Sequence, residues 1–96
     1  MEILDYQIFQ HLKGLPFVQQ IWLFGSRARG DYQDRADIDI ALYCPKATSA
    51  DWQQVLDLID EADTLLKIDC VRLDELDETS ALKKAIELQG IKLYEL

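Results

Sequence analysis

The segment from residue 37 to residue 43 alternates strictly between two kinds of side chain. One set is acidic or small and the other is aliphatic: Asp37, Asp39 and Ala41 against Ile38, Ile40 and Leu42. A period of two is that of a β-strand with one face on the core, and Pro45 ends the pattern. A buried strand with two carboxylates on one face needs a core on one side and a polar setting on the other, which constrains the fold around it.

The remaining elements follow from periodicity and from helix-end signals. We expect a helix over 2–13 ended by Gly14, a strand over 18–24, and one helical turn over 27–30. Thr48 and Asp51 have the spacing of a capping box and predict a helix that continues to Ala62. A strand over 67–73 follows, then a helix opened by Thr79 or Ser80, and a short edge strand over 91–94.

This order of helices and strands predicts an α+β fold with two layers. We expect a small mixed β-sheet with helices packed mainly on one face, and with the aspartates on the partly open opposite face. The 96 residues are enough for one domain, so residues 1–96 are predicted to form a single unit.

Composition excludes several classes of protein. The chain is 49% hydrophobic and 29% charged, which is typical of a folded soluble domain. No apolar run is long enough to span a membrane, and the first residues lack the pattern of a signal peptide, so we expect a cytoplasmic protein. The net charge of −8 opposes general nucleic-acid binding and suits a basic protein partner.

Histidine and cysteine chemistry is also limited. His11 is the only histidine, which leaves no His-based triad or multi-histidine metal site. Cys44 and Cys70 lie far apart in apolar segments, and we interpret them as buried, reduced thiols.

Three aspartates are the strongest candidates for chemistry. Asp37 and Asp39 project from the same face of one strand, with Cα atoms ~7 Å apart, and their charges repel each other. Asp69 stands in another apolar strand and completes a three-carboxylate cluster if the two strands are neighbours. Oxygen donors without nearby histidine or cysteine favour Mg²⁺ or Mn²⁺.

A possible phosphate-binding turn precedes them. Gly25 and Ser26 directly follow a strand, where glycine allows close approach of the backbone and free N–H groups with a hydroxyl can bind phosphate oxygens. Each feature also has a simpler interpretation. The Asp-x-Asp pair can be a solvated face, the Gly-Ser pair a plain turn, and Asp69 an edge-strand charge. Arg27 and Arg29 can form surface ion pairs with Asp31 or Asp34.

The combination is more specific than its parts. Gly25-Ser26, ten intervening residues, Asp37-x-Asp39 and the later Asp69 resemble the signature of the DNA polymerase β-like nucleotidyltransferase superfamily. The fuller strings over 24–31 and 37–41 look like the small MNT-type members, which serve as antitoxins beside helical HEPN-domain toxins. This resemblance covers nearly the whole chain and implies a minimal nucleotidyltransferase domain over residues 1–96.

The resemblance also implies roles for individual residues. Asp37 and Asp39 would bind catalytic metal ions, and Asp69 would complete the metal site and help to deprotonate the acceptor. Gly25 and Ser26 would hold the terminal phosphates of the nucleotide. We place Arg27 with them, although contact with phosphate, local packing and contact with a partner all stay open for Arg27 and Arg29.

The reaction implied is transfer of a nucleoside monophosphate, with ATP as donor and Mg²⁺ or Mn²⁺ as cofactor. Because the residues are all used in the core, we expect another chain to hold or to be the acceptor. The resemblance favours AMP transfer to a tyrosine of a cognate HEPN toxin. Two alternatives stay open: a small-molecule nucleotidyltransferase completed by a partner subunit, and a non-catalytic antitoxin that acts by binding. Base preference, acceptor, metal and oligomeric state stay undetermined.

Overall fold

The computed structural model describes residues 7–31, 33, 36–62 and 64–96. Its elements follow the predicted order, with one added 3₁₀ turn: α1 Gln7–Lys13, β1 Gln20–Phe24, α2 Ser26–Arg29, β2 Ile38–Tyr43, α3 Ser49–Asp60, β3 Ile68–Arg72, η2 Leu73–Glu75, α4 Ala81–Gln89 and β4 Ile91–Glu95. The predicted first turn of α1, over residues 2–6, lies outside the described residues.

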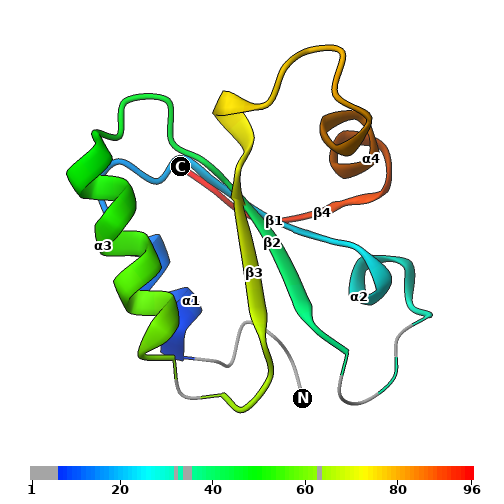
Figure 1. The fold of residues 1–96 in the computed structure, drawn as a ribbon, viewed down its shortest axis with the longest axis horizontal. Helices are drawn as coiled ribbons and strands as arrows, with labels where there is room; N and C mark the ends of the chain where they lie inside the picture. Colours follow the sequence, from blue (N-terminus) through cyan, green and yellow to red (C-terminus); the bar gives the residue numbers. More distant parts are fainter. Residues whose placement is uncertain (1–6, 32, 34–35, 63) are drawn as a thin grey trace.

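The four strands form one mixed sheet in the order β3-β2-β1-β4 (Figure 1). β1 is antiparallel to both β2 and β4, whereas β2 and β3 are parallel. A parallel pair needs a long crossover, which α3 and its flanking loops supply. β4 lies at one edge, as predicted, and the sheet has the mixed α+β character expected from the sequence.

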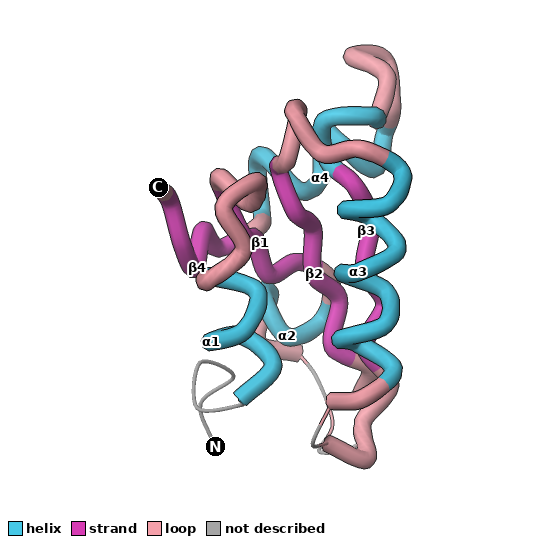
Figure 2. The backbone as a smooth tube through the Cα atoms, turned by 90° about the vertical axis from the view of Figure 1, so that its left-hand side faces the viewer, coloured by secondary structure: helices cyan, strands magenta, loops and turns pink. Residues whose placement is uncertain are grey.

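The predicted alternation of β2 is confirmed. Ile38, Ile40 and Leu42 are fully buried in the main core, beneath α1 and α3, which share one face of the sheet (Figure 2). That core consists of eleven buried residues: Ile8, Phe9, Leu12, Val18, Ile21, Leu23, Ile38, Ile40, Leu42, Cys44 and Val55.

The opposite face is only partly covered. Ala41, Leu73 and Ile86 form a smaller buried cluster there. The helix α4 and the turn η2 thus cover the part of that face around Ala41. Asp39 lies on the same face, nearer the start of β2, and is partly buried. The helices therefore lie mainly on one face, and the aspartates lie toward the more open side.

Capping interactions explain where α3 and α4 begin. The predicted capping box is present: the Asp51 N–H donates to Thr48 Oγ1 at 3.1 Å, and the Thr48 N–H donates to Asp51 Oδ2 at 2.9 Å. Ser80, rather than Thr79, caps α4 by accepting from the Lys83 N–H at 3.2 Å. Gly90 is the C-cap of α4, where the backbone turns to an extended conformation, and a Cβ there would overlap the Ile86 carbonyl.

Strand boundaries differ from the prediction by one or two residues. Asp37 precedes β2, because the first bond of the ladder to β3 runs from the Ile38 N–H to the Lys67 carbonyl, at 2.8 Å. Leu73, predicted as the last residue of the third strand, is instead the first residue of η2. Both cysteines are free, with Cys44 fully buried and Cys70 partly buried. No helix in the described part of the chain is long and apolar enough to cross a membrane.

Candidate active site

The predicted site residues lie at one end of the strands, where β1 ends and β2 and β3 begin (Figure 1, lower side). Phe24, the last residue of β1, pairs with Asp39, and Asp39 pairs with Asp69 in the parallel ladder. Side chains at paired positions project from the same face of a sheet. The condition for a carboxylate cluster, that the strands of Asp39 and Asp69 are neighbours, is therefore met, and Gly25 directly follows the residue paired with Asp39.

Gly25 lies against the Asp39 carboxylate. Its φ of 75° and ψ of −156° belong to a region that essentially only glycine adopts. A Cβ at this position would overlap Oδ2 of Asp39. Glycine is thus required both by the backbone conformation and by the closeness of the carboxylate.

The turn continues as the short helix α2. The N–H groups of Ala28 and Arg29 both donate to the Gly25 carbonyl at 3.1 Å, and Gly30 ends the turn with a φ of 84°. Among the hydrogen bonds between described residues, none uses the Ser26 hydroxyl. Ser26 thus stands at the start of the turn with a hydroxyl available to a ligand.

Charge repulsion concentrates on Asp39. Burial raises the pKa of Asp39 most, and the negative charges of Asp69 and Asp37 raise it further, together with a hydrogen bond that the protonated Asp39 carboxyl donates to Asp69. The positive charge of Arg29 lowers this pKa in part. The three aspartates therefore share one electrostatic neighbourhood, and a bound cation would relieve their repulsion.

The three carboxylates do not close into a metal cage. Asp37 is exposed, and the half-exposed Asp69 carboxylate lies 3.5 Å from Lys67 Nζ. Over the described residues, no three His, Cys, Asp or Glu side chains are arranged to hold a metal ion. Mg²⁺ is commonly bound by one or two carboxylates together with substrate phosphates and water. The donor set thus fits a divalent cation that arrives with a nucleotide.

The two arginines next to the turn have different contacts. Arg27 donates from Nε and Nη2 to the Ala36 carbonyl, at 3.3 and 3.0 Å. Arg29 forms an exposed ion pair with Asp31 at 3.2 Å, as one of the simpler interpretations predicted. Asp34, the other predicted partner, lies outside the described residues.

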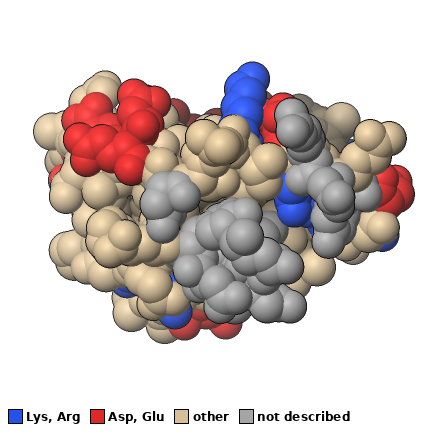
Figure 3. Space-filling model, turned by 90° about the horizontal axis from the view of Figure 1, so that it is seen from below, with Lys and Arg blue, Asp and Glu red and all other residues tan. Residues whose placement is uncertain are grey.

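A groove beside Asp37 was not predicted from the sequence. It has a volume of about 430 Å³ and is lined by Asp37, Leu65, Leu66 and Lys67. Leu65 is fully exposed at its rim. Two leucines directly before a strand were the only signal in the sequence. In the view from below, the largest group of acidic side chains lies at the upper left, on the α3 side, and smaller acidic and basic groups lie elsewhere on this face (Figure 3).

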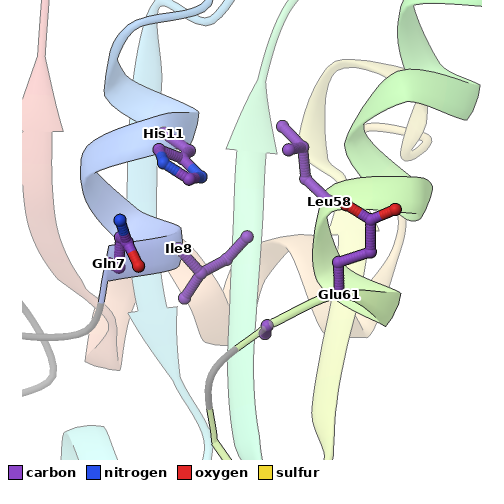
Figure 4. Close-up of a pocket in the computed structure, with 6 residues that line it drawn as sticks. Gln7, Ile8, His11, Leu58 and Glu61 are labelled. Carbon is purple, nitrogen blue, oxygen red and sulfur yellow. The ribbon is translucent and has the colours of Figure 1, made fainter.

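A second hollow lies between α1 and α3. Its volume is about 90 Å³, and Figure 4 shows Gln7, Ile8 and His11 of α1 facing Leu58 of α3 and Glu61, the residue after α3. None of the predicted site residues lines it, and His11 is exposed there. Its size fits a few water molecules, at roughly 30 Å³ each, and is too small for a nucleotide.

Comparison with known proteins agrees with this geometry. The sequence model of the family described as polymerase beta, nucleotidyltransferase matches residues 6–96. The chain belongs to this nucleotidyltransferase family. No curated protein matches the chain.

Solved structures of similar fold include two from toxin–antitoxin systems. One, a toxin–antitoxin crystallised with AMP-PNP, has a TM-score of 0.68 and 25% identity, over 93% of this chain and 72% of the other. A substituted form of the toxin–antitoxin MntA-HpeT has a TM-score of 0.64 and 26% identity, over 94% and 68%. A putative nucleotidyltransferase from Sulfolobus solfataricus shares the fold at 21% identity, with a TM-score of 0.58, over 93% and 75%.

Proposed function

We propose that this nucleotidyltransferase is an antitoxin that transfers AMP from ATP to a tyrosine hydroxyl of a cognate HEPN-type toxin. The observation that carries the proposal is the contact of Gly25 with Asp39, beside Asp69, because it joins a phosphate-binding turn to a carboxylate pair. The similarity to toxin–antitoxin structures, one of them with AMP-PNP, supports both the partner and the nucleotide.

The turn would hold the terminal phosphates. Without a Cβ, Gly25 allows phosphate oxygens to approach the backbone, and the Ser26 hydroxyl adds a donor. Asp37, Asp39 and Asp69 would hold Mg²⁺ or Mn²⁺ beside this turn. A divalent cation bound there would offset the negative charge that develops on the transferring phosphoryl group.

Asp69 is the proposed proton acceptor. The toxin hydroxyl would lose its proton to the Asp69 carboxylate while its oxygen attacks the α-phosphorus. The bond between the α-phosphorus and the bridging oxygen breaks, and pyrophosphate leaves with that electron pair. The groove beside Asp37, with Leu65 exposed at its rim, offers an apolar surface on which a toxin segment would lie near the carboxylates.

Intact-mass measurement tests this reaction. The purified toxin and antitoxin are incubated with ATP and Mg²⁺, and we expect the toxin to gain the mass of one adenylyl group or more. Asp37→Ala combined with Asp39→Ala should abolish the gain, and omission of the antitoxin serves as the second control. An unchanged toxin mass, with both proteins folded and bound to each other, would contradict the proposal.

A second candidate is an antitoxin that acts by binding alone. It is favoured by the lack of a closed three-donor metal group among the described residues. It predicts that the double Asp37→Ala, Asp39→Ala variant still neutralises the toxin in cells. Loss of neutralisation by a variant that still binds the toxin would exclude it.

A further inference from the structure

Arg27 contacts the peptide that carries a candidate metal ligand. Its Nε and Nη2 donate to the carbonyl of Ala36, the residue directly before Asp37, at 3.3 and 3.0 Å. A planar guanidinium that places two donors on one acceptor fixes the acceptor in direction as well as in distance. This contact is partly buried, which strengthens it relative to an exposed one.

Asp37 depends on such support because it lies outside the sheet. The β2–β3 ladder begins one residue later, with the Ile38 N–H bound to the Lys67 carbonyl at 2.8 Å. The Asp37 side chain is exposed. Its position is therefore set from both sides along the chain, by the ladder at Ile38 and by Arg27 at Ala36.

The same arginine also belongs to the phosphate-binding turn. Arg27 directly follows Ser26 in α2, so its backbone moves with Gly25 and Ser26. One side chain thus connects the turn proposed to hold phosphate with the segment that carries Asp37. An arginine that bound phosphate through the same two donors would have to give up the Ala36 carbonyl.

We propose that Arg27 is a positioning residue, which holds Asp37 at a fixed place relative to the Gly25-Ser26 turn and so prepares it to bind a divalent cation. Arg27 then acts through Asp37 rather than on phosphate. The inference rests on the proposed function, since it assigns Asp37 to the cation of a bound nucleotide. Removal of a group that orients a metal ligand typically lowers metal affinity by roughly 10–100-fold.

The test compares the Mn²⁺ affinity of the variants by electron paramagnetic resonance, in the presence of a saturating concentration of a non-hydrolysable ATP analogue. Arg27→Gln should weaken Mn²⁺ binding by about tenfold or more. Arg27→Lys, which keeps the charge but cannot place two coplanar donors on the carbonyl, should recover only part of the loss. Lys46→Gln removes an equal charge from an exposed loop at the other end of β2 and should leave Mn²⁺ affinity unchanged.

A double-substitution cycle separates positioning from direct phosphate binding. If Arg27 acts through Asp37, Arg27→Gln should change Mn²⁺ affinity less than about twofold in an Asp37→Asn background. Full additivity of the two substitutions would overturn the inference. So would a loss of metal-free nucleotide affinity equal to the loss of Mn²⁺ affinity, because that result indicates a phosphate ligand.

Failure of the inference and failure of the proposed function give different results. If the wild-type protein binds Mn²⁺ with the nucleotide and Arg27→Gln binds it equally well, only the role of Arg27 is wrong. If the wild-type protein binds no Mn²⁺ with the nucleotide, the proposed function fails and the inference fails with it. Thermal unfolding of each variant verifies the fold, and Arg27→Lys provides the comparison if Arg27→Gln is unstable.

Discussion

Gly25 and Asp39 are in such close contact that any side chain at position 25 would overlap the Asp39 carboxylate. The antiparallel register of β1 and β2, which pairs Phe24 with Asp39, brings them together. The turn after one strand thus lies against an acidic side chain of the next. A phosphate bound at this turn would lie close to a carboxylate, which requires a cation between them.

Gly25→Ala should therefore impair both the fold and the site. The glycine-only backbone conformation costs about 1–3 kcal/mol for another residue, and the added methyl group must also displace Asp39. We expect a loss of urea stability in this range and loss of the proposed AMP transfer.

Gly30→Ala is the matched control. Gly30 also has a positive φ, 84°, but no atom of the described residues lies within 4 Å of a Cβ built there. This variant should lose about 1 kcal/mol and keep its transfer activity. Equal loss of activity in both variants would show that backbone strain, rather than displacement of Asp39, decides the outcome.

Asp39→Asn should stabilise the protein without divalent cations. Burial and the charges of Asp69 and Asp37 disfavour the Asp39 carboxylate, as its raised pKa reflects, and an amide removes that repulsion. In EDTA at neutral pH, we expect the variant to unfold at a higher temperature than the wild type. Mg²⁺ with ATP should raise the unfolding temperature of the wild type and have a smaller effect on the variant.

Asp60→Asn is the control for Asp39→Asn, because it removes an equal charge from an exposed position at the end of α3. Its stability should change by no more than about 0.5 kcal/mol. A lower unfolding temperature for Asp39→Asn in EDTA would instead mean that the Asp39 carboxylate has a favourable partner in the free protein.

Arg72 should contribute much more to stability than an exposed arginine. It is 13% exposed and forms ion pairs with Asp74 at 3.0 Å and Glu75 at 2.9 Å. It also donates to the carbonyls of Cys44 and Ala47, at 3.1 and 2.9 Å. Arg72→Ala leaves the largely buried Asp74 carboxylate without its cation, and should cost about 3 kcal/mol in urea unfolding.

Arg29→Ala provides the comparison for Arg72. Its ion pair with Asp31 has a similar length, 3.2 Å, but both side chains are largely exposed. Such pairs contribute about 1 kcal/mol or less. A similar loss for both variants would contradict the view that burial of the pair governs its contribution.

The sequence predicts what local patterns determine. The period of two over β2 placed Ile38, Ile40 and Leu42 in the core, and the Thr48–Asp51 spacing located the start of α3, because both depend on neighbouring residues. The family resemblance grouped Gly25, Asp39 and Asp69 in one site, and the structure brings the three residues to the same end of the sheet.

Contacts between residues far apart in the sequence could not be predicted from such local patterns. The register of β1 against β2 sets the contact between Gly25 and Asp39, and no local signal encodes it. The bond from Arg27 to the Ala36 carbonyl depends on how the intervening chain returns to the sheet. The partial cover of the aspartate face likewise required the position of Ile86 on α4 relative to Ala41.

Cys44 should resist alkylation in the folded protein. Burial, and then the nearby charge of Asp74, raise the pKa of its thiol to about 12. The thiolate is the reactive form, so its fraction at pH 8 falls by roughly a thousandfold relative to an ordinary cysteine. We expect peptide mass mapping after iodoacetamide treatment at pH 8 to show Cys44 unmodified in the native protein and modified in urea. Native alkylation at the rate seen in urea would mean that the end of β2 opens readily to solvent.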